Sequence, residues 1–285
     1  MGNMISEIDL HMHTSASDGT NSPSALLAQI RKMGIRIFSC TDHDTIDGVL
    51  EILNYSPDDI RFIPGVEFSC KSSVGKCHIL GCGIDCMNEK LIEALETGRR
   101  LREEKLNHRL EHLRSVLGIS MDENEIKWLR DQNSPGKPHI GRLLVAHGLA
   151  KSVAEAIKKY LDPIRVDNDR LSSKFAIDII QFAGGVPVWA HPLGGEGERH
   201  LTNAEFQTQL HVLLSEGIRG MECWYSRYAM DEVTFLTSQA QKHQLLISGG
   251  SDYHGISKPD IHLGQLNSEG IACSDEQLTL LKEVP

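Results

Sequence analysis

Two histidines one residue apart, His11 and His13, follow a short apolar run at the start of the chain. We expect the run to be a strand, in which alternate side chains point to the same face, so that both imidazoles would bind one cation. Asp18 follows on a serine- and glycine-rich loop and would add a carboxylate. Imidazole and carboxylate donors together suit Zn, Mn or Fe. The opening therefore predicts a metal site, and the fold has to bring further ligands to the end of this strand.

Size and charge narrow the classes of protein that the sequence fits. With 285 residues, the chain forms one large domain or one domain that carries an insertion. Its formal net charge of −10 argues against a general nucleic-acid binder, which would present a basic face. No apolar run is long enough to span a bilayer, and the first residues do not resemble a secretion signal. We expect no membrane, no long nucleic acid and no protein partner.

The cysteines indicate the compartment. There are seven, an odd number, and none forms a CxxC pair. Cys70, Cys77, Cys82 and Cys86 lie close together in the sequence, which leaves a small zinc site open as an alternative. Cysteines in a cytosolic protein are usually reduced and serve as small apolar side chains. We therefore expect a cytoplasmic protein with free thiols.

Apolar strands alternate with amphipathic helices over most of the chain. After the first strand, we expect strands at residues 35–40, 61–69, 77–84, 186–190, 218–224 and 245–248. This alternation predicts an α/β fold with a parallel sheet or barrel. Between residues 88 and 169 no strand is evident, and the segment has the apolar spacing of helices. We predict a barrel formed by residues 1–87 and 172–285 and a helical insertion, residues 88–171, that caps the substrate.

Potential metal ligands lie at or just beyond nearly every expected strand end. In parallel β/α barrels, catalytic groups collect at the carboxyl ends of the strands. The ligands in these positions are His11, His13, His43, Glu67, His191, Asp252 and His254. His78 is the exception, because it falls at the start of its expected strand. A single buried histidine is most often a satisfied core residue, but the set as a whole is poorly explained by chance.

These residues resemble the motifs of the PHP (polymerase and histidinol phosphatase) family of metal-dependent phosphoesterases. The resemblance covers residues 5–86 and 172–256. Besides the opening His-x-His, it rests on Thr41-Asp42-His43, Pro64-Gly65-Val66-Glu67, His191-Pro192 and Asp252-Tyr253-His254. It implies a distorted (β/α)7 barrel that holds three divalent metal ions, with Mn favoured and Fe or Zn as alternatives.

The resemblance also implies a role for each ligand. The first metal would be held by His11, His13, Glu67 and Asp252. Glu67 would bridge to a second, completed by His78 and His191, and the third would be held by Asp18, His43 and His254. The residues given a direct catalytic role are Glu67, His43 and Asp252. Some family members have histidine in place of Asp18, and the carboxylate here favours Mn or Fe over Zn.

Six cationic residues are predicted to bind the substrate. Arg99 and Arg102 interrupt a stripe of leucines on the longest expected helix, where they either reach solvent or surface carboxylates or meet an anionic group of the substrate. Lys137, His139 and Arg142 open another helix, whose N-terminus would attract phosphate. Arg227 follows a later strand. The Lys-Pro-His-x-x-Arg pattern in the insertion resembles the PHP subgroup that acts on nucleotides and ribose phosphates.

The resulting functional prediction is a metal-dependent phosphoesterase acting on a small phosphorylated metabolite. A metal-bridging hydroxide would attack the phosphorus of a ribose cyclic phosphate or a 3′,5′-nucleotide bisphosphate. The alternatives are a histidinol-phosphate phosphatase, a 5′-3′ exoribonuclease on short RNA, and a PHP module that serves as a non-catalytic scaffold. An amidohydrolase acting on C–N bonds is disfavoured, because no lysine stands at a strand end to bridge metals.

Overall fold

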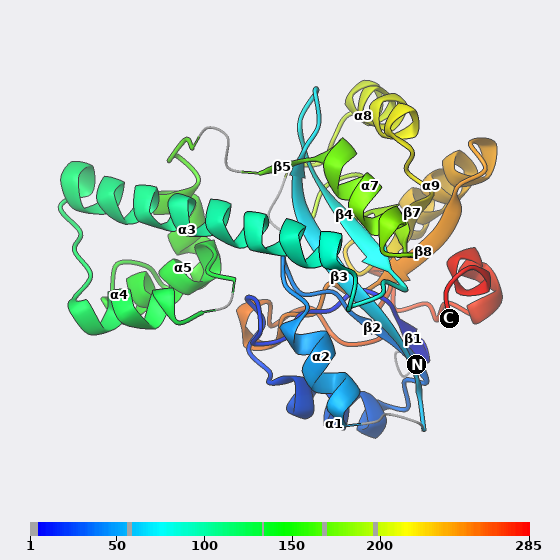
Figure 1. Cartoon of the computed structure of the whole chain (residues 1–285), viewed down its shortest axis with the longest axis horizontal. Helices are drawn as coiled ribbons and strands as arrows, with labels where there is room; N and C mark the ends of the chain where they lie inside the picture. The colour runs from blue at the N-terminus through cyan, green and yellow to red at the C-terminus, as the bar shows by residue number, and fades with distance from the viewer. Residues whose placement is uncertain (1–4, 56–58, 133, 167–169, 196–198) are drawn as a thin grey trace.

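The computed structural model describes residues 5–55, 59–132, 134–166, 170–195 and 199–285. Within these residues the chain forms a barrel-shaped sheet surrounded by helices, with a group of helices projecting from one side (Figure 1). The strands that form the sheet are β1 (Ile8–Asp9), β2 (Ile37–Cys40), β3 (Arg61–Lys71), β4 (Lys76–Cys82), β6 (Val186–Trp189), β7 (Gly220–Tyr225) and β8 (Leu246–Gly250). The predicted α/β fold with a distorted seven-stranded barrel is confirmed.

The barrel is nearly closed where β8 meets β1. The Leu10 amide donates to the Gly249 carbonyl at 3.1 Å, and the Asp252 amide donates to the His11 carbonyl at 2.8 Å. The order of the strands around the sheet is β1-β2-β3-β4-β6-β7-β8, and the short strand β5 (Leu171–Ser172) pairs with the far end of β3. These backbone hydrogen bonds therefore bring His11, the first predicted ligand in the sequence, next to Asp252, one of the last two.

Strand β4 runs antiparallel to both of its neighbours, β3 and β6, whereas the other adjacent strands in this order pair in parallel. The expectation of a wholly parallel sheet is therefore wrong at this point. Only four residues, Ser72 to Gly75, connect β3 to β4, and so short a connection makes a hairpin rather than a crossover. Because β4 is reversed, its first residues lie beside the carboxyl-terminal half of β3, and His78 pairs with Ser69. This reversal explains why His78 stands at the start of its strand.

Helices cover the outside of the barrel. Their ends carry the expected signals: Ser22 accepts a hydrogen bond from the Ala25 amide at the start of the first helix, and Gly34 ends it in the left-handed conformation. Thr202 and Glu205 form a capping box at the start of another. The helices around the barrel are α1 (Pro23–Met33), α2 (Asp47–Asn54), α7 (Ser173–Phe182), α8 (Asn203–Glu216) and α9 (Met230–Lys242), followed by 3-10 turns at Gly255–Ser257, Asp275–Gln277 and Thr279–Lys282.

The long helix α3 (Glu89–Leu117) joins the barrel to the projecting helices (Figure 1). Its first turns pack into the barrel core through Leu91 and Leu95. Its later residues Leu106 and Leu113 belong to a second apolar cluster formed with the other helices of this region. These are α4 (Glu123–Arg130), α5 (Lys137–Ala146) and α6 (Val153–Ala156), which continues as a π-helical turn, Ile157–Leu161.

A second core of this kind is what a separate insertion would require. The division into residues 1–87 with 172–285 and residues 88–171 stays a prediction, and positions 1–4, 56–58, 133, 167–169 and 196–198 within it lie outside the described residues. None of the described helices combines the length and the apolar character that crossing a membrane requires.

The contact between β8 and β1 leaves no room for a side chain at Gly250. A Cβ atom placed there would lie 2.2 Å from the Cβ of His11 and 2.5 Å from its backbone nitrogen. We expect Gly250→Ala to lower the free energy of unfolding by about 1–3 kcal/mol, because backbone and not a flexible side chain has to move. Urea denaturation measures this loss. Gly75→Ala is the control, since the nearest atom to its Cβ is 3.6 Å away, and equal stability of the two variants would contradict the prediction.

Candidate metal centre

The nine predicted metal ligands come together at one end of the barrel. They follow the ends of β1, β2, β6 and β8, or lie within β3 and near the start of the reversed β4. Most are fully or nearly fully buried, and only the side chains of His43 and His78 are more than a tenth exposed, at 12% and 17%. The residues that the structure brings together are His11, His13, Asp18, His43, Glu67, His78, His191, Asp252 and His254.

Glu67 lies at the centre of this group. Its Oε1 is 2.8 Å from His78 Nδ1 and 3.3 Å from His191 Nε2. On the other side, Oε2 is 3.1 Å from His13 Nε2 and from His43 Nδ1, and 3.3 Å from His11 Nε2. One carboxylate thus faces five imidazoles, which come from four separate stretches of the chain. This geometry fits a carboxylate that bridges cations.

Two further carboxylates flank Glu67. Asp252 Oδ1 lies 3.4 Å from His13 Nε2 and 3.3 Å from His254 Nδ1. Asp18 Oδ1 is 3.2 Å from His254 Nε2, and its Oδ2 is 3.9 Å from His43 Nε2. His13 lies between them, stacked on the His254 ring with the centroids 4.0 Å apart.

The donors in this cluster suit divalent metal ions. The side-chain atoms His43 Nδ1, Glu67 Oε2 and His78 Nδ1 are buried and have no hydrogen-bond partner among the described residues. Buried polar atoms without partners are rare unless something else satisfies them. Three groups have ligand atoms within 4.8 Å of one another: His13, Asp18, His43 and His254; His11, His13 and Asp252; and His43, Glu67 and His78.

These groups resemble the predicted ligand sets but are not identical to them. His43 is near Glu67 and His78 as well as Asp18, and His191 approaches Glu67 without belonging to a group. The assignment of each residue to a particular metal ion therefore stays a prediction.

The charges in the cluster shift the pKa values of its members strongly. Burial alone would raise the pKa of Glu67, but the nearby His43, His78 and His11 hold it well below its usual value. Burial would lower the pKa of His13, but the close approach of the Asp252 and Glu67 carboxylates and the charge of Asp18 raise it to about 9. Because an imidazole has to be deprotonated to bind a metal ion, metal binding would compete with protons at His13.

The sequence analysis missed the residues that support these ligands. Glu222 of β7 accepts a hydrogen bond from His11 Nδ1 at 2.8 Å through Oε1, and its Oε2 accepts from the His191 amide at 2.7 Å. A carboxylate behind a histidine fixes the orientation of the ring and leaves the other nitrogen free for a metal. Glu222 is fully buried, and a lone acidic residue in an apolar strand is the signal that identifies it.

Asp252 has a similar support. Its Oδ2 accepts hydrogen bonds from the Tyr225 hydroxyl at 3.0 Å and from Lys258 Nζ at 2.7 Å, which leaves Oδ1 to face the histidines. Asp252 and His191 both have a positive φ, of 60° and 30°. This conformation is unusual for residues other than glycine and is found most often at functional sites.

The predicted substrate-binding residues differ from one another in burial and in their contacts. Arg102 is buried, and its guanidinium donates to Asp44 Oδ2 at 2.5 Å and to Ser69 Oγ at 2.7 Å. Arg99, one turn earlier, is exposed. Arg102 therefore ties α3 to the residue that follows His43, so that a protein carboxylate occupies the place predicted for substrate. Arg227 is half-buried just beyond β7.

The cations at the start of α5 also contact the protein. Lys137 pairs with Asp162 at the surface at 2.5 Å. His139 is almost fully buried and accepts a hydrogen bond from the Gly136 amide, and burial lowers its pKa to about 4. Arg142 donates to the Asp18 carbonyl at 2.8 Å and to Ser257 Oγ at 2.7 Å. Arg142 thus joins the loop that bears Asp18 to the segment after His254.

The barrel and the imidazoles and carboxylates at its strand ends together define a metal-dependent hydrolase. Residues 9–169 match the PHP domain family. The chain therefore belongs to the PHP domain family, as its motifs predicted.

Relatives of known name cover nearly the whole chain. The 5′-3′ exoribonuclease of Escherichia coli (strain K12) is 32% identical over 267 residues, 90% of this chain and 88% of that protein. The 3′,5′-nucleoside bisphosphate phosphatase of Chromobacterium violaceum is 27% identical over 254 residues, 88% of each. The phosphoribosyl 1,2-cyclic phosphate 1,2-diphosphodiesterase of Eggerthella lenta is 24% identical over 264 residues, 90% of this chain and 97% of that protein.

A solved structure agrees with these relatives. It is a protein of Bifidobacterium adolescentis proposed to be a metal-dependent phosphoesterase, with a TM-score of 0.80 and 26% identity, covering 92% of this chain and 93% of that one. The relatives are all phosphoric ester hydrolases, and this chain is an enzyme of the same class.

The buried ion pair between Arg102 and Asp44 provides a test of how α3 is held. We expect Arg102→Met to lower the free energy of unfolding by about 3–5 kcal/mol, because it leaves the Asp44 carboxylate buried without its cation. Arg99→Met, on the exposed face of the same helix, should change it by less than about 0.5 kcal/mol. Urea denaturation of the two variants compares them directly. If both were as stable as the wild type, Arg102 would be free to contact a substrate as first predicted.

Proposed function

We propose that the protein hydrolyses phosphate esters of a small nucleotide or ribose-phosphate metabolite, using the cluster around Glu67 to bind three divalent metal ions. The observation that carries this proposal is the approach of five imidazoles to one buried carboxylate, whose Oε2 has no hydrogen-bond partner within the described part of the chain. Mn²⁺ is the first metal to test, because three carboxylates accompany the histidines and oxygen donors favour harder cations.

The ligands would act as one connected set. Glu67 would be shared between metal ions, with His11, His13 and Asp252 on one side, His78 and His191 on another, and Asp18, His43 and His254 completing the third position. Divalent metal ions at such a site supply a hydroxide nucleophile at neutral pH and neutralise the charge on a phosphate ester.

The protein's own residues orient this set. Glu222 holds the His11 ring by Nδ1 and the backbone of His191 at the same time, so that both imidazoles keep a fixed direction. Tyr225 and Lys258 fix the Asp252 carboxylate. His43 and His78 are the most exposed of the ligands, so an ester would reach the cluster beside them.

The substrate class is supported by the relatives and by charge. The named relatives act on short RNA ends, a nucleoside bisphosphate or a ribose cyclic phosphate, all of which are phosphorylated ribose compounds. The chain itself has a formal net charge of −10, which favours a small anion that reaches local cations over an extended polyanion.

The experiment that tests the proposal is a hydrolysis screen of the Mn-loaded protein, in which released inorganic phosphate and the nucleotide or sugar products are both measured. The panel contains adenosine 3′,5′-bisphosphate, 5′-AMP, a ribose 1,2-cyclic phosphate 5-phosphate, a 5′-phosphorylated RNA trinucleotide and histidinol phosphate. We expect turnover of one of the first four and loss of that turnover after removal of the metal with a chelator. Preference for histidinol phosphate, or no hydrolysis of any ester, would refute the proposal.

Two ligand substitutions test the metal cluster itself. We expect Glu67→Gln and Asp252→Asn to lower bound metal and to reduce phosphate release by more than about 100-fold, because each removes a charged ligand that two or more histidines face. Asp59→Asn is the matched control, since Asp59 is half-exposed and pairs with Arg31 at the surface. Metal content is measured by elemental analysis of each purified variant. Full metal content and turnover in either ligand variant would show that the assignment is wrong.

A further inference from the structure

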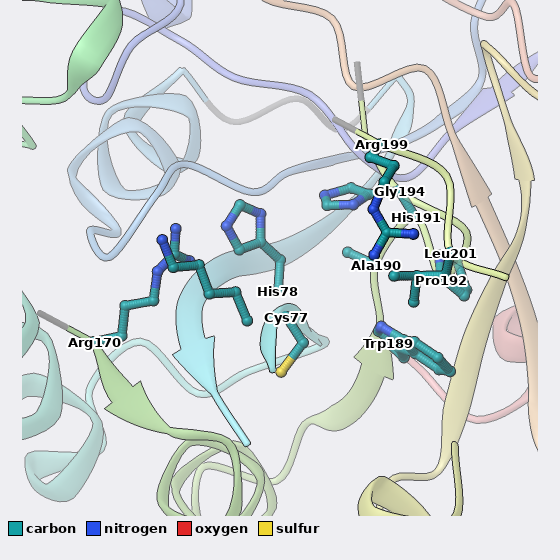
Figure 2. Close-up of a pocket in the computed structure, with 11 residues that line it drawn as sticks. Cys77, His78, Arg170, Trp189, Ala190, His191, Pro192, Gly194, Arg199 and Leu201 are labelled. Atoms are coloured by element: carbon teal, nitrogen blue, oxygen red, sulfur yellow. The ribbon is translucent and has the colours of Figure 1, made fainter. Parts of the chain in front are cut away.

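A cleft opens beside the His78 and His191 end of the metal cluster (Figure 2). It is lined by the start of β4, by the residues after β6 and by Arg170, which directly precedes β5. Its volume of about 60 Å³ holds a few water molecules. That is room for a phosphoryl group but not for a nucleobase.

The lining of this cleft is cationic. Lys76, Arg170 and Arg199 contribute to it, and no aspartate or glutamate does among the described residues. Arg199 is two-thirds exposed, and its guanidinium is neutralised by two hydrogen bonds to Glu205, at 2.9 and 2.7 Å. Arg199 therefore contributes little to the attraction of anions. Because it also lines the cleft, it is a useful control for substitutions of Arg170.

Arg170 is different. Its Nε and Nη1 atoms are buried, and neither has a hydrogen-bond partner in the part of the chain that the structure describes. A guanidinium presents five N–H donors that match the oxygens of phosphate or carboxylate. Leaving such donors buried and unsatisfied is costly. The Nε and Nη1 donors of Arg170 thus have no acceptor among the described residues, and a bound anion would supply one.

The backbone and the neighbours of Arg170 place it next to the reaction site. Leu171, the next residue, pairs with Cys70 of β3, three residues from Glu67 on the same strand. Figure 2 shows His78 between Arg170 and His191. Arg170 therefore faces the same space as the imidazoles that approach Glu67.

Three of the cations predicted from the sequence to bind substrate contact the protein itself. Lys137 pairs with Asp162, Arg102 with Asp44, and Arg142 joins two loops of the barrel. An anionic group of the substrate other than the ester being cleaved therefore meets unsatisfied, buried donors at Arg170 and not at these residues.

We propose that Arg170 and the cleft beside His78 form a subsite for a second phosphoryl group of the substrate, one that is bound and not cleaved. The inference rests on the proposed function and specifies it: the preferred substrate carries two phosphoryl groups. Selection occurs because a singly phosphorylated ester leaves the Arg170 donors without an acceptor.

The test compares two substrates on three proteins: the wild type, Arg170→Met and Arg199→Met, all loaded with Mn²⁺. The substrates are adenosine 3′,5′-bisphosphate and, as the singly phosphorylated partner, whichever of 3′-AMP and 5′-AMP carries the ester that the wild type cleaves in the bisphosphate. For Arg170→Met we expect kcat/KM on the bisphosphate to fall about 10- to 100-fold, mainly through KM, as for the loss of hydrogen bonds to a charged group. On the monophosphate it should change by less than about 3-fold. Arg199→Met should leave both values near those of the wild type.

A binding measurement separates this inference from the proposed function. Inorganic phosphate is titrated into the metal-free protein by calorimetry, and we expect heat of binding for the wild type and Arg199→Met and none for Arg170→Met. Arg170→Lys, which keeps the charge but not the fork of donors, should bind phosphate more weakly than the wild type and shows whether loss in Arg170→Met comes from charge or from misfolding.

Each remaining outcome counts against one of the two proposals. A wild type that hydrolyses no ester refutes the proposed function, and the phosphate titration then decides the subsite alone. If the wild type is active and Arg170→Met has the same kcat/KM on the bisphosphate, the proposed subsite is wrong. An equal loss on both substrates also overturns it, because Arg170 would then act on the cleaved group or on the fold.

Discussion

The structure depends on the approach of five imidazoles to the buried carboxylate of Glu67. The distances run from 2.8 to 3.3 Å, and the histidines come from four separate stretches of the chain. A carboxylate taken out of water costs several kcal/mol unless opposite charge compensates it. The parallel pairing of β1, β2 and β3 brings His11, His13 and His43 to Glu67. The reversed β4 adds His78, and its pairing with β6 adds His191.

Much of this arrangement was predictable from the sequence, because the ligands occur at the ends of apolar runs whose carboxyl ends meet in a barrel. The segment between residues 88 and 169, expected to be helical, contains α3, α4, α5 and α6, and every predicted ligand joins the cluster. The sequence identified His78 as a ligand but did not explain why it falls at the start of its strand. Only seven residues separate the expected strands at 61–69 and 77–84, which is too few for a crossover helix, so the hairpin could have been recognised from length alone.

Other features could not be predicted, because they depend on distant contacts. Glu222 lies 211 positions from His11 along the chain, and only the closed barrel shows that the two hydrogen-bond. Arg102 interrupts a leucine stripe, a pattern equally compatible with an exposed side chain, a substrate ligand or a buried ion pair. The structure shows the buried ion pair. Its partner is Asp44, which follows His43, has a φ of 51° and faces α3. A local pattern cannot reveal the partner of a long side chain.

The helices outside the barrel also affect the chemistry that the site can perform. Arg102 braces the residue after His43, and Arg142 bridges the loop of Asp18 and the segment after His254. Helices α3 and α5 thus support the segments that carry three of the nine candidate ligands. Interactions between exposed charges fall off over about 8 Å at physiological ionic strength. If Arg170 binds an anion as proposed, its attraction would act only within the cleft, and the net negative charge of the chain would favour a small bisphosphate over an extended polyanion.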